Sequence, residues 1–387
     1  MLSHRVPENP EPNAWARKLA ALRAAGGPVA DLTASHPGAL GLSPLGPAAE
    51  ALAAAGVGSC MPAPLGEPAA RAAIAADLES RGLRAETDRV VITASTSESY
   101  AQLFRLLADP GEAIAFPAPS YPLFEPLALA EGVRPLTYRL AWDGAWHLDR
   151  GSFTAALRTA KAVVLVEPNH PTGTCLDRDE REFVEASVER AGCALIADEV
   201  FREHPWPGRT SLPSWLDGPR RAPTFVLGGL SKQCGLPQLK LGWIVAAGPA
   251  RARGEALAGL EWLADLQLSV GSPVQAALPA LLALSREFVP RVRERLVANL
   301  EALDALALAR PVVTRLPGLG GWSAVLRVPA TRGAGDWALS LLERSVAVHP
   351  GDFYGFERGE HLVVSLIASP ADVRRGCAEL SGLLAGG

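Results

Sequence analysis

The sequence predicts an α/β protein with a doubly wound, mostly parallel sheet and a second, smaller α+β domain. Between residues 67 and 250, short apolar runs rich in β-branched residues alternate with Ala-, Leu-, Arg- and Glu-rich segments of helical period. Apolar strands that alternate with amphipathic helices are typical of parallel sheets covered by helices on both faces. Ligands bind at the carboxyl ends of the strands in such sheets, so we expect functional residues just after these runs.

The predicted elements follow in order along the chain. Strands are expected at residues 89–94, 112–118, 162–168, 193–198, 224–229 and 241–247, and helices include 97–108 and 178–192. After residue 273, one long helical stretch interrupted by Pro279 and Pro290 leads to strands near 320–328 and 361–368. We therefore assign a large domain to residues 46–285 and a small domain to residues 1–45 plus 286–387.

The composition excludes several classes of protein. A net charge of −4 and a pI near 6.0 give no basic surface, so nucleic acid is not an expected partner. The five cysteines form no CxxC pair, which argues against a disulfide framework or a structural zinc site, and we expect no metal. The first residues carry early prolines and charges without an apolar segment, so we expect no signal peptide there. No run approaches ~18 apolar residues, and we therefore expect a cytoplasmic protein without a membrane partner.

Two strand ends carry groups that could bind an anion and a cation. Ser95, Thr96 and Ser97 end one strand and open a helix, where free N–H groups, hydroxyls and the helix dipole suit a phosphate. The alternative is a simple N-cap cluster, which is more common. Asp198 closes another buried strand, and an unpaired buried carboxylate costs several kcal/mol. Its partner would be a protonated ring nitrogen or an arginine.

Two further strand ends complete the predicted site. Lys232 follows the run TFVLGG in the segment GGLSKQCGLPQLKLGW, and a lysine at the ligand-binding edge of a sheet can form a Schiff base. Tyr121 lies between prolines and could stack on a flat ligand, although packing is the commoner role. Asn169 and His170 lie in a proline-rich turn. A lysine, a strand-end acid, a phosphate cradle and an aromatic ring together suit pyridoxal 5'-phosphate.

These motifs resemble those of the fold-type-I, class I/II aminotransferases over essentially the whole chain. The family motif S-K-x-x-G-x-P-G-L-R-x-G-W reads S-K-Q-C-G-L-P-Q-L-K-L-G-W here, and the family's D-E-V-Y reads D-E-V-F. The resemblance implies a seven-stranded sheet in the large domain and a homodimer with the active site at the subunit interface. It also implies that Lys232 carries the cofactor, Asp198 binds the pyridine nitrogen and Tyr121 stacks on the ring. The phosphate would be bound by Ser95, Thr96, Ser97, Ser231 and Lys240.

Several positions depart from the family motifs. His170 replaces the asparagine that donates to the cofactor's phenolic oxygen, and Phe201 replaces a tyrosine that donates to the same atom. With fewer external donors, the phenolate should bond more strongly to the imine N–H, so we expect the internal aldimine to stay protonated to higher pH than is usual in the family. Lys240 replaces the phosphate-binding arginine and loses its bidentate fork. The tyrosine that reaches the neighbouring subunit's phosphate is replaced by Cys60 or Met61.

The most consequential departure concerns the substrate. The family arginine that binds the substrate α-carboxylate is replaced by Val363. Either another cation takes its place, with Arg315, Arg327 and Arg358 in the right part of the chain, or the substrate is not a simple α-amino acid. Ser35 and His36 are candidates for substrate binding in the N-terminal segment.

The sequence therefore predicts a pyridoxal 5'-phosphate-dependent aminotransferase that acts on a small-molecule amino donor and a 2-oxo acid acceptor. Lys232 would move the proton at the substrate Cα, and Asp198 would keep the pyridine nitrogen protonated. The alternative is a lyase, cyclase, oxidase or decarboxylase of the same fold that acts on a specialised substrate. A cofactor-binding regulator without turnover is disfavoured, because the chain has no helix-turn-helix segment or basic stretch.

Overall fold

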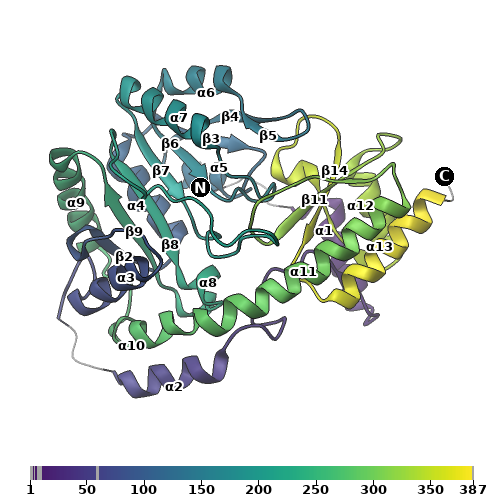
Figure 1. Cartoon of the computed structure of the whole chain (residues 1–387), viewed down its shortest axis with the longest axis horizontal. Coiled ribbons are helices and arrows are strands. Elements are labelled where there is room, and N and C mark those ends of the chain that lie inside the picture. Colours follow the sequence, from purple (N-terminus) through teal and green to yellow (C-terminus); the bar gives the residue numbers. More distant parts are fainter. Residues whose placement is uncertain (1–2, 4, 7–10, 58–60, 386–387) are drawn as a thin grey trace.

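A large twisted sheet forms the core of the larger half of the molecule (Figure 1) in a computed structural model, which describes residues 3, 5–6, 11–57 and 61–385. Its eight strands lie in the order β2-β9-β8-β7-β6-β3-β4-β5. Their bounds are β2 Val90–Thr93, β3 Ala113–Ala118, β4 Arg134–Trp142, β5 Trp146–Leu148, β6 Ala160–Val166, β7 Ala194–Asp198, β8 Thr224–Gly229 and β9 Gly242–Ala247. The six predicted strands are all present, with ends shifted by at most two residues.

The sheet is parallel at its centre and antiparallel at its edges. Strands β8, β7, β6, β3 and β4 run parallel, whereas β9 pairs antiparallel with both β8 and β2. The predicted fold class is confirmed, but the sheet has eight strands rather than seven. The additional strand, β5, has only three residues and forms an antiparallel hairpin with β4 at the edge.

Helices cover both faces of this sheet, as a doubly wound fold requires. One face packs on α3 (Pro68–Ser80), α6 (Arg150–Leu157), α7 (Arg178–Ala191) and α10 (Ser272–Ala283), and α2 (Leu45–Ala55) lies against α10. The other face packs on α4 (Thr96–Leu107), α5 (Phe124–Ala130) and α9 (Ala250–Asp265). Helix α7 begins at a capping box made by Asp177 and Glu180, and it ends at Gly192 in the left-handed conformation.

A second core lies around a four-stranded antiparallel sheet in the order β10-β11-β14-β13. Its strands are β10 (Thr314–Arg315), β11 (Ser323–Val328), β13 (His349–Pro350) and β14 (Glu360–Ser365), and its helices are α12 (Ala334–Glu343) and α13 (Pro370–Ala385). Near the N-terminus, α1 (Ala14–Ala24) contacts α12, and β1 (Ala30–Asp31) pairs with β12 (Val346–Ala347). The start of the chain therefore packs with its C-terminal part.

The long helix α11 (Ser285–Ala309) connects the two cores (Figure 1). The prediction that Pro279 and Pro290 interrupt the helical stretch is wrong. Both prolines lie inside helices, and the boundary between α10 and α11 falls at Leu284. Each proline leaves one carbonyl without its helical partner, and the packing of both helices against buried cores offsets that loss. In the described ranges, none of these helices is both long enough and apolar enough to cross a membrane.

Candidate functional site

Asp198 is a buried carboxylate at the carboxyl end of β7. Its Oδ2 accepts a hydrogen bond of 2.7 Å from the Tyr100 hydroxyl on α4, and its Oδ1 accepts one of 3.1 Å from the Val200 amide. Burial raises the pKa of Asp198, while these two donors act in the opposite direction because they favour the charged form. An arginine was one expected partner, and that expectation is wrong. A phenol and a backbone amide satisfy the carboxylate and leave further lone pairs free.

Lys232 lies on the single turn α8 (Leu230–Gln233), directly after β8. Its Nζ is 4.8 Å from the centroid of the Trp322 ring and 5.4 Å from that of Phe201. Burial lowers the pKa of Lys232 to about 8, and the nearby Asp198 carboxylate partly opposes this shift. Among the described residues, no acceptor is hydrogen-bonded to the Lys232 amine. At pH 7 roughly a tenth of the amine is therefore neutral and nucleophilic, a far larger fraction than in an exposed lysine of ordinary pKa.

The backbone around Lys232 makes close contacts at two glycines. A Cβ on Gly228 would lie 2.4 Å from Nε1 of Trp243, and one on Gly229 would lie 3.2 Å from the Cα of Gly242. His204 fixes the other side, because its Nε2 donates a 2.7 Å hydrogen bond to the Lys232 carbonyl. Burial lowers the pKa of His204 to about 4, so this imidazole is a neutral support for the lysine.

The predicted phosphate cradle lies at the N-terminus of α4. Ser95 is the N-cap of this helix, and its Oγ accepts a 3.1 Å hydrogen bond from the Glu98 amide. Within the described chain, the amides of Thr96 and Ser97 form no hydrogen bond. A Cβ on Gly242 would lie 3.1 Å from the Ser95 carbonyl carbon and 3.2 Å from the Thr96 nitrogen. The glycine thus keeps space open beside two free donors, which suits an anion.

The other predicted phosphate ligands differ in their exposure. Ser231 is half-buried on α8, next to Lys232. Lys240 is exposed, with a left-handed φ of 49°, and it belongs to none of the ion pairs of the described residues. Its charge is therefore available to a ligand at the start of β9. Cys60 lies outside the described residues.

Three rings gather beside Lys232. His170 stacks on Phe201 with centroids 5.9 Å apart, and Tyr121 meets His170 edge to face at 6.3 Å. The Nδ1 of His170 is 3.2 Å from the Ser323 hydroxyl, and burial lowers the pKa of His170 to about 3. Asn169 is also close, but its amide donates to Pro119 and Thr172 and accepts from Ser120. Asn169 therefore braces the turn that carries His170.

The small sheet closes the site from the opposite side. The Tyr354 carbonyl accepts a 2.9 Å hydrogen bond from the Ser120 amide, which joins the 351–354 turn to the loop of Tyr121. The Tyr354 ring meets His170 at 5.3 Å, and its hydroxyl is 2.9 Å from Nδ1 of His349. Val363 is buried on β14. The predicted substrate residues Ser35 and His36 are exposed. They directly follow Ala34, whose carbonyl accepts a hydrogen bond from the Ser365 hydroxyl on β14.

The three arginines considered as replacements for the missing cation do not contact this site. Arg315 forms a 3.0 Å hydrogen bond with Asp304 and lies over the Trp206 ring. Arg327 and Arg358 are exposed, and Arg327 is four residues from Ser323 along β11. The expectation that one of them takes the place of the arginine is therefore not supported by their positions.

Sequence reasoning missed six residues of the site: Tyr100, His204, Trp322, Ser323, His349 and Tyr354. Each reaches the site from an element whose place depends on the tertiary fold. One signal was present, because the chain has only four tyrosines and seven histidines. Three of those tyrosines lie at the site. In a chain rich in Ala and Leu, the few tyrosines and histidines were therefore candidates for site residues.

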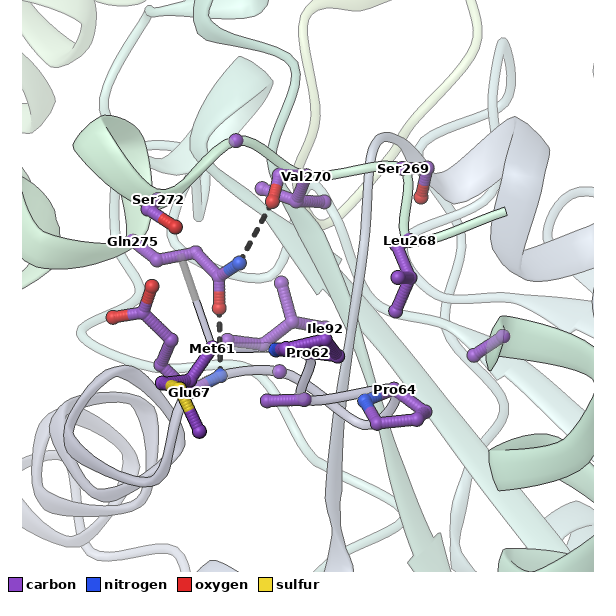
Figure 2. A pocket seen from close by; sticks show the side chains of 14 residues that line it. Met61, Pro62, Pro64, Glu67, Ile92, Leu268, Ser269, Val270, Ser272 and Gln275 are labelled. Carbon is purple, nitrogen blue, oxygen red and sulfur yellow. Dashed lines mark hydrogen bonds between the residues drawn. The ribbon is translucent and has the colours of Figure 1, made fainter. Parts of the chain in front are cut away.

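A hollow next to the cradle is lined by two segments, residues 61–67 and 268–275, together with Ile92 and Ala264 (Figure 2). Gln275 bridges the segments, because its Oε1 accepts from the Glu67 amide and its Nε2 donates to the Val270 carbonyl. The Ser269 hydroxyl donates to Glu98 at 2.8 Å, which links this hollow to the first turn of α4. Met61 lies at its rim with 77% of its surface exposed.

Comparisons with known proteins agree on one family. The sequence model of the family described as aminotransferase class I and II matches residues 47–380. Nicotianamine aminotransferase 1 from Oryza sativa subsp. japonica is 28% identical over 59% of this chain and 47% of its own length. The S-alkyl-thiohydroximate lyase from Arabidopsis thaliana is 27% identical over 58% of this chain. This match covers 47% of the length of the lyase. The chain thus spans about half the length of these curated relatives.

The fold is shared with solved structures. The alanine aminotransferase from Pyrococcus furiosus superimposes with a TM-score of 0.86, at 22% identity, over 96% of both chains. At this level of identity, the match establishes the fold of the chain.

Proposed function

Because this chain belongs to the aminotransferase class I and II family, we propose that it is a pyridoxal 5'-phosphate-dependent aminotransferase that moves an amino group from a donor to a 2-oxo acid. The observation that carries the proposal is the half-buried Lys232, whose amine lies near the Asp198 carboxylate and has no hydrogen-bond partner among the described residues. When bound, pyridoxal phosphate supplies an aldehyde that links to a lysine amine and a ring that accepts electrons from the substrate Cα.

The residues of the site each have a role in this proposal. The Asp198 carboxylate holds a proton on the pyridine nitrogen, and Tyr100 orients that carboxylate. The free amides of Thr96 and Ser97, with Ser95, Ser231 and Lys240, bind the phosphate at the positive end of α4. Tyr121 packs against the ring. The Lys232 amine removes and returns the proton at the substrate Cα, a role that its lowered pKa supports because a neutral amine can accept a proton.

The alternative is lyase, cyclase, oxidase or decarboxylase chemistry on the same cofactor. Two observations keep this reading open. A lyase is among the relatives of the chain, and Val363 stands where the resemblance implies an arginine for the substrate carboxylate.

The test has two stages. Protein purified with pyridoxal phosphate should show a visible absorption band, and Lys232→Ala should lose it. Lys161→Ala is the matched control, because that exposed lysine pairs with Glu112 on the surface. A panel of amino donors should then convert the bound cofactor to its amine form. A band that survives in Lys232→Ala, or product release from every donor without conversion of the cofactor, would contradict the proposal.

We also propose that the chain forms a homodimer through the surface around the hollow beside α4. Support comes from its exposed apolar side chains, since Met61 is 77% exposed and Leu268 is 44% exposed at its rim. A second copy would cover these side chains and lie close to the cradle, because Ser269 in the same wall donates to Glu98.

A further inference from the structure

One face of the small sheet points toward His170. Side chains alternate along a strand, and Ala324, Leu326, Leu362 and Val364 point into the small core. The residues between them, Ser323, Val325, Val363 and Ser365, therefore point to the opposite face, where Ser323 meets His170 at 3.2 Å. Because His349 is paired with Val363 in the register, its side chain lies on this face too.

Two histidines on this side of the site are joined by one tyrosine. The Nδ1 of His349 is 2.9 Å from the Tyr354 hydroxyl, and the Tyr354 ring meets His170 at 5.3 Å. The His349 ring is also packed against Trp15 at 5.1 Å and Phe353 at 5.7 Å. If the hydroxyl donates to Nδ1, the Nε2–H of His349 is left as a free donor in a fixed orientation.

Lys232 is near enough to His170 to lower the pKa of that imidazole, but this part of the site has no cation in direct contact with it among the described residues. Among the residues that the structure describes, no arginine or lysine side chain forms a hydrogen bond, an ion pair or a ring contact with His170, His349, Ser323 or Tyr354. A carboxylate buried here without a cation would lose several kcal/mol of hydration. A histidine that can become charged when the anion arrives removes that cost.

We propose that His349, held by Tyr354, binds the carboxylate of the substrate and takes up a proton from solvent as it does so. This inference rests on the proposed function, because it concerns the substrate of the same site. It makes the substrate an amino acid rather than a simple amine, and it makes His349 a specificity-determining residue.

The charges around His349 fix the direction of its pH dependence. Burial lowers the pKa of the free His349, and the Asp31 carboxylate on β1 partly opposes that shift. Asp31 is itself paired with Arg23 at 2.7 Å, and the other facing titratable groups are His170 and Tyr354. The free imidazole is therefore neutral at neutral pH. A bound carboxylate raises the pKa of His349, so binding should weaken by up to about tenfold for each pH unit between the pKa of the free imidazole and that raised pKa, and should level off above it.

The experiment compares carboxylates with their neutral amides. Propionate and 3-phenylpropionate, and propionamide and 3-phenylpropionamide, carry no amino group and do not react. Their binding to the protein loaded with pyridoxal phosphate is measured between pH 6 and 9 from the shift of the visible band. Calorimetry in two buffers of different ionisation enthalpy then measures proton uptake.

The expected result has three parts. Carboxylates bind at least tenfold more tightly than amides at pH 6.5, His349→Gln removes most of that preference, and proton uptake disappears with it. Tyr354→Phe should weaken the preference several-fold, and it provides a second variant should His349→Gln fold poorly. His147→Gln is the control, because His147 is exposed and pairs with Asp143.

Two outcomes would overturn the inference. Carboxylates and amides could bind equally to the unmodified protein, or His349→Gln and Tyr354→Phe could both keep the preference and its pH dependence. If the unmodified protein shows no visible band with pyridoxal phosphate, the proposed function fails instead, which keeps the two failures distinguishable.

Discussion

At the scale of single residues, Glu199 is the buried acid whose titration should be easiest to detect. Its carboxylate accepts hydrogen bonds from the Ser214 hydroxyl at 2.7 Å and from the Trp215 amide at 2.5 Å. Burial nevertheless raises the pKa of Glu199 from 4.5 to about 7. The folded protein thus binds this proton more tightly than the unfolded chain does.

The sign of the effect on stability follows from that shift. The stabilising contribution is complete below pH 4.5 and is lost as the pH rises through about 7. Relative to Glu199→Gln, which does not titrate, the free energy of unfolding of the unmodified protein should fall by roughly 3 kcal/mol across this window. Urea unfolding of both proteins at several pH values measures the difference. Parallel pH profiles would show that the carboxylate is not perturbed.

Tyr100→Phe should destabilise the protein in a pH-dependent manner. The Tyr100 hydroxyl donates to the charged form of Asp198, and losing a hydrogen bond to a charged group costs about 1.5–3 kcal/mol. Tyr138→Phe is a matched control, because Tyr138 is also fully buried and donates at 2.7 Å to the neutral Val164 carbonyl. Urea unfolding should show that the cost of Tyr100→Phe grows as the pH rises through the pKa of Asp198. The cost of Tyr138→Phe should stay constant.

Asp198 and Lys232 could be predicted as candidates from the sequence because Asp198 ends one apolar strand and Lys232 lies three residues after another. Their supports could not be found in this way. Tyr100 lies 98 positions from Asp198, and His204 lies 28 positions from the carbonyl it binds. Only the register of the sheet and the packing of α4 bring these pairs together. The same holds for His349, which is placed by its pairing with Val363.

At the scale of elements, the close approach of β9 to the first turn of α4 controls the cradle. Gly242→Ala would place a methyl group 3.1–3.2 Å from the Ser95–Thr96 backbone, which must shift to make room. We expect the affinity for pyridoxal phosphate to fall about tenfold, which corresponds to about 1.4 kcal/mol. Equilibrium binding followed by the visible band measures this change.

The control for that experiment is Gly254→Ala on α9, where no atom lies within 4 Å of the added methyl group. This substitution should stabilise the helix by about 0.5–1 kcal/mol and leave the cofactor affinity unchanged. An unchanged affinity in Gly242→Ala would show that the cradle does not depend on this contact.

The strand β4 shows where element prediction fails. Its nine residues, RPLTYRLAW, mix charged, polar and apolar side chains. Among them, Leu136, Tyr138 and Leu140 pack in the core on the face of the sheet that α3, α6, α7 and α10 cover. Strands β6 and β7, in contrast, are apolar nearly throughout because helices cover both of their faces. A strand near the edge of the sheet lacks that continuous apolar signal.

At the scale of the whole molecule, the proposed dimer can be tested with one substitution. Met61→Glu places a charge on the apolar rim of the hollow, so the protein should shift from dimer to monomer at micromolar concentration. Sedimentation velocity measures the shift. Leu308→Glu is the control, because Leu308 is 85% exposed on α11 and should leave assembly unchanged. A monomeric unmodified protein would contradict the proposal.

The position of Trp322 gives the molecule a built-in optical reporter. Its indole ring lies 4.8 Å from the Lys232 amine and is almost completely shielded from water. A chromophore attached at that amine would quench the indole's fluorescence by energy transfer. The emission of the protein should therefore dim as the cofactor loads and recover as it leaves. The loss of signal should be smaller in Trp322→Phe, so that loading can be timed without any substrate.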